Sequence, residues 1–157
     1  MRSKLYALAA AAVALAGMAT PAQAARITLR SSVFVERAEQ LGQGTSVRTV
    51  SKATTVAPGD RLVYQLNWRR DEQASEGFTV TTPLPRHVSY QRSADGREEV
   101  SADGGRTWGR LGQLRVRDVD GRMRDALPED VTHVRWQVPR QIALAGEGRI
   151  TYSAIVH

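Results

Sequence analysis

The chain has 157 residues, no cysteine and a formal net charge of +6. The lack of cysteine excludes disulfide bonds, a thiol nucleophile, thiolate metal sites and a lipid anchor on cysteine. The length suits one domain whose core is large enough to be stable without covalent cross-links.

The first 24 residues have the layout of a cleaved secretory signal. Arg2 and Lys4 give a positive start, an apolar run covers 5–19, and small residues at Ala22 and Ala24 precede the expected cleavage point. A retained membrane anchor is the less favoured alternative, because the run is shorter than the roughly 20 residues that span a bilayer. We therefore predict a signal peptide over 1–24, a single mature domain over 25–157 without an integral membrane segment, and a periplasmic or secreted protein.

Apolar and polar residues alternate along much of the mature chain, as in strands with one buried face. In chain order, we expect strands over 26–36, 45–51, 62–68, 77–82, 87–92, 98–102, 107–116, 131–138 and 150–156. The predicted core consists of Leu62, Tyr64, Leu66, Trp68, Val134, Trp136, Tyr152, Ala154 and Val156.

Turns rich in glycine and aspartate separate these segments. They are Gly42-Gln43-Gly44, Pro58-Gly59-Asp60, Asp95-Gly96, Asp103-Gly104-Gly105, Asp120-Gly121 and Gly146-Glu147-Gly148. The best helical candidate is a single turn at 128–130, and the longest irregular loop is expected over 118–130. Many short strands with regular turns predict an all-β fold, an antiparallel β-sandwich of about seven to nine strands.

Four segments follow one another as in a known family. They are Val56-Ala57-Pro58-Gly59-Asp60-Arg61-Leu62-Val63-Tyr64, the strand, proline corner and strand over 78–90, Val134-Arg135-Trp136, and the turn and strand over 145–152. Over about residues 47–157, the chain resembles the family catalogued as domain of unknown function 11, an immunoglobulin-like β-sandwich of exported and cell-surface proteins. Thr82 stands where this family usually has the aspartate of Asp-x-Leu-Pro, and 69–72 replace its Asn-Gly turn. The resemblance implies an immunoglobulin-like sandwich, no enzymatic activity and no particular ligand.

Residues 101–108 match the pattern S-x-D-x-G-x-T-W, which resembles the Asp box of sialidase-type propellers. Ser and Asp side chains accept backbone N–H bonds in such a turn, and the aromatic residue packs beneath it. A propeller needs several copies and a longer chain, so we predict a structural hairpin and disfavour glycan cleavage. Ser93-Ala94-Asp95-Gly96 repeats the first half of the pattern and predicts a neighbouring turn.

Acidic residues gather after the predicted strand at 107–116, where Asp118-Val119-Asp120-Gly121 invites a calcium hypothesis. Its glycine does not follow EF-hand spacing, so a solvated acidic loop is favoured even with Asp125, Glu129 and Asp130 nearby.

The remaining polar residues give no catalytic pattern. His87, His133 and His157 lack ligand spacing, no serine lies on a nucleophile elbow, and the adjacent carboxylates Glu98-Glu99 and Glu129-Asp130 should not form acid/base pairs. We therefore predict that the protein is not an enzyme, and we assign no catalytic, cofactor-binding or metal-binding residue and no cofactor.

Arginine supplies nearly all of the positive charge of the mature chain. Without Arg2 and Lys4, 20 basic residues face 16 acidic ones, a net charge of +4, and Lys52 is the single lysine. A surface rich in arginine could bind phosphate, carboxylate or anionic glycan. Because the arginines are spread along the chain, we favour GC-rich codon usage as the explanation of their number. No recognisable motif supports nucleic-acid binding.

Three functional hypotheses remain. The favoured one is a non-catalytic exported β-sandwich, an envelope-associated interaction or structural module with a protein or other envelope component as its partner. The second is a secreted glycan-binding or glycan-processing protein that uses Trp68, Trp108 and the arginines. The third is a periplasmic assembly factor in which an exposed last strand, ending near Ile155, pairs with a strand of the partner.

Overall fold

The computed structural model describes residues 27–40, 46–70 and 76–157. The predicted signal peptide and the Gly42-Gln43-Gly44 turn lie outside these residues. The strands are β1 (Ile27–Gln40), β2 (Ser46–Lys52), β3 (Arg61–Arg70), β4 (Phe78–Pro83), β5 (Val88–Ser93), β6 (Glu99–Ser101), β7 (Arg115–Arg117), β8 (Met123–Asp125), β9 (His133–Val138) and β10 (Glu147–Val156). The helical turns are η1 (Leu111–Gln113), η2 (Pro128–Asp130) and α1 (Arg140–Ala143). No helix in the described ranges is long and apolar enough to cross a membrane.

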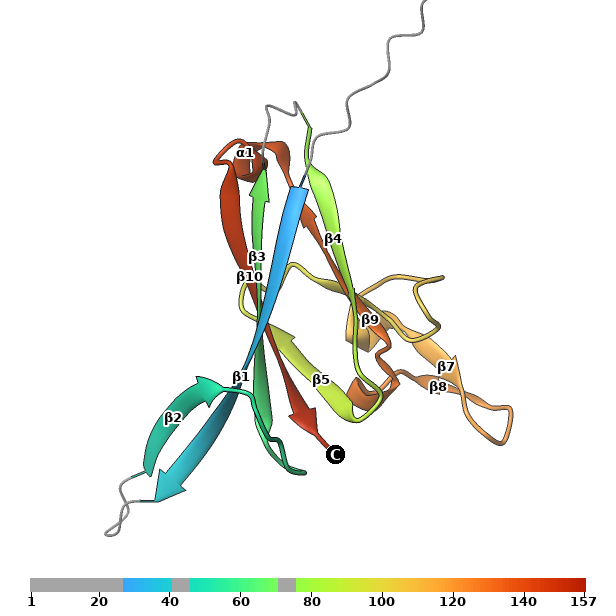
Figure 1. Cartoon of the computed structure of the whole chain (residues 1–157). Helices are drawn as coiled ribbons and strands as arrows, with labels where there is room; N and C mark the ends of the chain where they lie inside the picture. Colours follow the sequence, from blue (N-terminus) through green and yellow to red (C-terminus); the bar gives the residue numbers. More distant parts are fainter. Residues whose placement is uncertain (1–26, 41–45, 71–75) are drawn as a thin grey trace, which may run out of the picture.

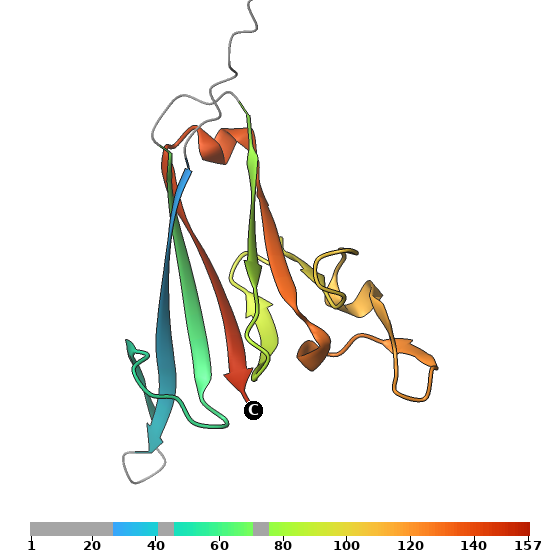
Figure 2. The same ribbon diagram turned by 45° about the vertical axis from the view of Figure 1, so that its right-hand side comes forward.

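Two antiparallel sheets form the layers of the molecule (Figure 1). The large sheet has the strand order β2-β1-β3-β10-β5, and the small sheet has the order β4-β9-β6. Figure 2 shows the two sheets facing each other, with α1 closing one end and the β7-β8 hairpin projecting beyond the small sheet. The predicted all-β sandwich is therefore confirmed.

The core lies between the sheets and is built around stacked aromatic rings. Tyr64 and Tyr152 are register partners on β3 and β10, and their rings stack with centroids 4.6 Å apart. Trp136 comes from β9 in the opposite sheet, 5.3 Å from the Tyr152 ring. Trp68 meets Phe78 edge to face at 5.1 Å. All nine predicted core residues are buried, because the period of two in β3, β9 and β10 places their apolar side chains on one face.

The last strand is an inner strand of the large sheet. β10 pairs with β3 on one side and with β5 on the other, so its prediction as an exposed edge strand was wrong. The alternation of apolar and polar residues shows which face of a strand is buried. Edge strands and inner strands share this pattern, so the sequence of β10 could not reveal its pairing with β5.

The segment between β6 and β9 also differs from expectation. A strand over all of 107–116 was wrong, because η1 interrupts it and only β7 is extended at its end. The predicted irregular loop over 118–130 contains β8, which pairs with β7 across the predicted turn at Asp120-Gly121. The single helical turn expected at 128–130 is confirmed as η2. The short α1 was not expected.

Candidate functional site

The Asp-box segment forms a tightly bonded turn after β6. The Ser101 hydroxyl donates to Oδ1 of Asp103 at 2.7 Å and accepts the N–H of Gly105 at 2.9 Å. The Asp103 carboxylate accepts the N–H of Thr107 at 2.9 Å and its hydroxyl at 2.6 Å. These bonds, first among them the one from the Thr107 hydroxyl, hold the pKa of Asp103 far below its usual range. The Asp103 carboxylate therefore stabilises the turn, as predicted for a structural hairpin.

Trp108 closes this hairpin. Its indole N–H donates to the carbonyl oxygen of Gly105 at 2.9 Å, and the guanidinium carbon of Arg135 lies 4.4 Å from the ring centroid. Gly109 forms a bridge with Val100 that completes the turn. Trp108 therefore packs between a backbone turn and an arginine, which leaves less of its ring surface for a sugar.

The neighbouring turn at Ser93-Ala94-Asp95-Gly96 is built in the same way, as expected. The hydroxyl of Ser93 donates to Oδ1 of Asp95 at 2.8 Å, and the same carboxylate oxygen accepts the N–H of Arg97 at 3.3 Å. Ser93 is itself buried and accepts the indole N–H of Trp136. Ser93 thus joins this exposed turn to the core.

The adjacent carboxylates Glu98 and Glu99 face different partners. Glu98 accepts the hydroxyl of buried Tyr90 at 2.5 Å, whereas Glu99 accepts Nε of Arg135 at 2.8 Å. Burial, followed by the bond to Glu98, raises the pKa of Tyr90 well above its ordinary value. The two carboxylates thus bind different partners.

Three carboxylates of the acidic loop face arginine side chains. Arg124 donates to both carboxylate oxygens of Asp130, at 2.5 and 2.8 Å, and lies 4.0 Å from Asp118. Arg115 lies 3.8 Å from Asp125. The bond from Arg124 lowers the pKa of Asp130. Among the described residues, no group of three or more histidine, cysteine or acidic side chains could hold a metal ion.

The histidines lie outside the core, and their imidazoles contact hydroxyl groups at two places. His133 contacts the Thr132 hydroxyl at 3.1 Å, and Nδ1 of His157 lies 3.0 Å from the Ser89 hydroxyl. The chain brings His87 and His157 together through the backbone, where the N–H of His157 donates to the carbonyl of His87 at 3.1 Å. Within the described ranges, neither the His133 nor the His157 imidazole has a hydrogen bond to a carboxylate, so we assign them no chemistry.

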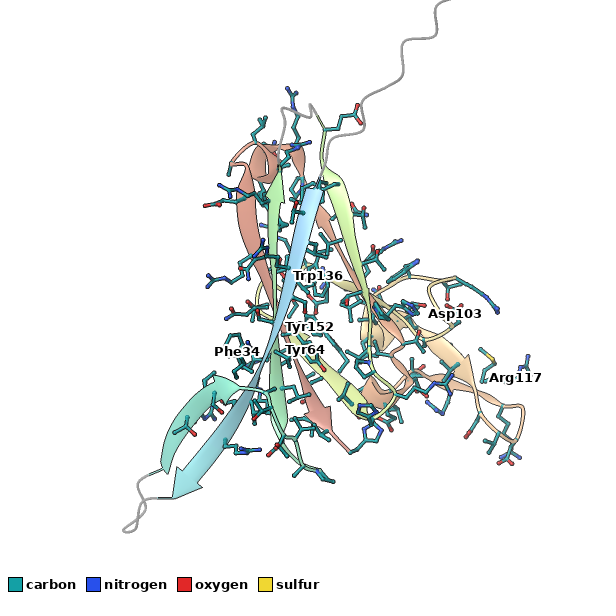
Figure 3. The ribbon with its side chains drawn as sticks, in the orientation of Figure 1. Phe34, Tyr64, Asp103, Arg117, Trp136 and Tyr152 are labelled. Atoms are coloured by element: carbon teal, nitrogen blue, oxygen red, sulfur yellow. The ribbon has the colours of Figure 1, made fainter. Side chains whose placement is uncertain are left out.

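The outer face of the large sheet carries a different kind of surface. Figure 3 shows Phe34 on this face, on the opposite side of the sheet from Tyr64 and Tyr152. Two rows of polar side chains cross β1, β3 and β10 at one end of it. The first row is Arg30, Asn67 and Arg149, and the second is Thr28, Arg69 and Glu147.

These two rows surround an open concavity of about 810 Å³. All three arginines that line it are exposed, and Arg149 donates to Oδ1 of Asn67 at 3.1 Å. Within the described part of the chain, neither Arg30 nor Arg69 takes part in an ion pair. Glu147 is the one acidic residue in the lining. The concavity thus combines an excess of positive charge with neutral hydrogen-bonding groups.

At the other end of the same face, a carboxylate already pairs with the arginines. Arg61 lies 3.7 Å from Glu36 and donates to the hydroxyl of Ser153 at 3.2 Å, and Arg48 donates to Glu36 at 3.1 Å. An incoming anion would have to displace Glu36 from these arginines. The concavity near Arg30, Arg69 and Arg149 is therefore the better candidate for a binding site.

Arg30, Arg69 and Arg149 are candidates that sequence reasoning missed. They are far apart in the chain and appear as part of an even spread of arginine. The alternation places Arg69 on the polar face of its strand, but only the pairing of β1 and β10 with β3 brings the three together. The register between strands, which the sequence does not reveal directly, was the missing information.

Comparisons of the chain with protein-family models, curated proteins and solved structures found no match. The likeness to domain of unknown function 11 therefore stays a prediction.

Proposed function

We propose that this protein is an exported, non-catalytic β-sandwich that binds another envelope component through the outer face of its large sheet. The observation that carries the proposal is the concavity lined by Arg30, Arg69 and Arg149 on three paired strands. Paired strands hold the backbone of such a site in place, so binding need not order the backbone as well as the side chains. The signal-like segment at 1–24 supports export.

The absence of enzymatic activity is part of the proposal. The polar groups that could suggest chemistry are engaged in local structure: Asp103 in its turn, Glu98 with Tyr90, and Asp130 with Arg124. An immunoglobulin-like arrangement, as in domain of unknown function 11, is consistent with this role, since such sandwiches present binding surfaces on a stable scaffold.

Affinity capture tests the proposed function. The full chain, purified after export with a carboxy-terminal tag, is immobilised and exposed to envelope extract. We expect one component to be captured reproducibly and released by raised salt, because charge contacts on an exposed face are screened. Reproducible absence of any partner would contradict the proposed binding role, and measurable turnover of a substrate would contradict its non-catalytic part.

Glycan binding is a second candidate, and the same concavity favours it. The hypothesis that Trp68 offers an exposed ring to a sugar is wrong, because Trp68 is only 3% exposed and packs in the core. Its position on the inner face of β3 follows from the alternation that made it a core candidate. The arginines are therefore the stronger basis for this function. Binding to immobilised acidic and neutral polysaccharides tests it directly.

The third candidate is assembly through an edge strand. Because β10 is an inner strand, the strand that could serve this role is β1. Among the described residues, Ile27 to Ser32 have strand partners on β3 alone, whereas β2 and the adjoining Ala53 bond β1 only from Val33 onward. Ile27 and Leu29 are exposed on this edge, at 36% and 44%. Such an edge can accept a strand from a partner. Full hydrogen-exchange protection of residues 27–32 in the monomer would argue against this candidate.

A further inference from the structure

We infer that the concavity on the outer face binds a glycan chain that carries carboxylate groups, with Arg30, Arg69 and Arg149 as its anion contacts. This inference rests on the proposed function, and it adds the chemical class of the occupant.

The spacing of the three arginines suits an extended ligand with more than one negative charge. Neighbouring strands lie about 4.8 Å apart and same-face residues of one strand about 6.8 Å apart. Arg30 and Arg149 flank Asn67 in one row, so their Cα atoms are separated by two strand spacings, about 10 Å. Arg69 lies in the next row, about 8 Å from each. Long arginine side chains can converge on one anion from these positions or contact neighbouring anions along a chain.

Arginine also matches the geometry of the anion. The planar guanidinium offers parallel N–H donors that bind a carboxylate in bidentate fashion, and it stays charged at any physiological pH. Arg30 and Arg69 are in no ion pair among the described residues, so a ligand carboxylate displaces no internal partner there. Arg149 would exchange or share its neutral bond to Asn67.

The remaining lining residues favour a glycan over a simple polyanion. Thr28 and Asn67 offer a hydroxyl and an amide beside the arginines, and Glu147 is an acceptor for hydroxyl groups. A sugar chain supplies hydroxyl donors between its charges, whereas a phosphate cluster would place only negative charge beside Glu147. Like charges at such short range are unfavourable.

A lipid surface and a nucleic acid fit less well. Membrane binding by a protein face uses apolar side chains that enter the lipid, but Trp68, the large apolar residue in the lining, is 3% exposed. Single-stranded nucleic acid requires exposed aromatic side chains for base stacking, and the lining offers none. The mixture of arginine, neutral polar groups and one acceptor carboxylate is complementary to an acidic glycan.

Calorimetric titration of the full chain with tetragalacturonate tests the inference, with maltotetraose and inorganic pyrophosphate as comparison ligands. The test variant combines R30Q, R69Q and R149Q. A control variant combines R86Q, R106Q and R122Q, which removes the same charge from exposed arginines elsewhere. A third variant, R30K/R69K/R149K, keeps the charge and removes the bidentate fork. Thermal melting checks that each variant is folded.

We expect tetragalacturonate to bind more tightly than either comparison ligand. The glutamine triple should weaken this binding at least about tenfold, because charge-assisted bonds are lost, while the control should stay within about twofold. The lysine triple should also weaken it by several fold, and it serves as the test variant if the glutamine triple does not fold.

Equal weakening by the test and control triples would overturn the inference, as would tighter binding of pyrophosphate or no binding of tetragalacturonate at millimolar concentration. Envelope capture with the same variants separates the two proposals. If the wild-type chain captures a partner that the glutamine triple loses, yet does not bind tetragalacturonate, only the glycan inference fails. If no partner is captured either, the proposed function fails as well.

Discussion

The indole N–H of Trp136 donates to the hydroxyl of Ser93 at 3.0 Å, and this buried bond joins the two sheets of the sandwich. Trp136 belongs to β9 in the small sheet, and Ser93 ends β5 in the large sheet. Ser93 in turn donates to Asp95, so one hydroxyl connects the aromatic core to a surface turn. A buried indole N–H without an acceptor is costly, which makes this pair important for stability.

Replacing Ser93 by alanine should therefore destabilise the protein by about 1–3 kcal/mol, the cost of leaving a buried donor unsatisfied. Urea denaturation measures the change in the free energy of unfolding. Ser89→Ala on the same strand is the matched control, because the Ser89 hydroxyl contacts the imidazole of exposed His157 and not a buried donor. Equal effects of the two substitutions would contradict the role assigned to Ser93.

Trp136→Ala should cost more, about 3–5 kcal/mol, since it removes a large side chain from the centre of the core. Trp136 is 2% exposed and packs against the Tyr152 ring. A large drop in the melting temperature is the expected result. A shift near zero would mean that the indole does not contribute to the core.

Gly148 lies directly against the Trp68 indole. A Cβ atom at this position would come within 2.6 Å of Cε2 of Trp68, closer than van der Waals contact allows. Gly148→Ala should therefore displace Trp68 and cost about 1–3 kcal/mol. Gly112→Ala is the control, because a Cβ atom there meets nothing within 4 Å. A Gly148→Ala protein as stable as this control would contradict the close packing.

The fold could be predicted from the sequence more fully than the site. The alternating residues of β3, β9 and β10 place Trp136 and Tyr152 in the core without any knowledge of strand order. The site depends on which strands are neighbours. Nothing in the local sequence of Arg149 indicates that β10 is an inner strand with Asn67 beside it. The short strand β8 was also missed, because its few residues carry little periodicity.

Stability at acidic pH should depend on Asp103. The hydrogen bonds of its turn depress its pKa below 3.8, its value in the unfolded chain. The stabilisation from the ionised Asp103 is therefore complete at a pH above the pKa of the unfolded chain. It is lost as the pH falls through the lower pKa of the folded protein. We expect stability to decline below about pH 4 and Asp103→Asn to reduce both the stability at neutral pH and the size of that decline. Asp60 and Asp130 also have lowered pKa values, so some decline should remain. An unchanged pH profile in Asp103→Asn would contradict this.

Calcium should leave the melting temperature unchanged. Three carboxylates of the 118–130 segment, at Asp118, Asp125 and Asp130, already face Arg115 or Arg124, and a cation bound there would have to displace these arginines. Differential scanning calorimetry with calcium and with a chelator gives the comparison. A higher melting temperature in calcium, reversed by the chelator, would revive the metal hypothesis.

The most direct test of the proposed function is quantitative capture from envelope extract by three forms of the full chain: wild type, R30Q/R69Q/R149Q and R86Q/R106Q/R122Q. Our account predicts that the wild type and the R86Q/R106Q/R122Q control capture the same component to similar extents, while R30Q/R69Q/R149Q loses most of it. Equal capture by all three folded proteins would contradict binding through the outer face of the large sheet.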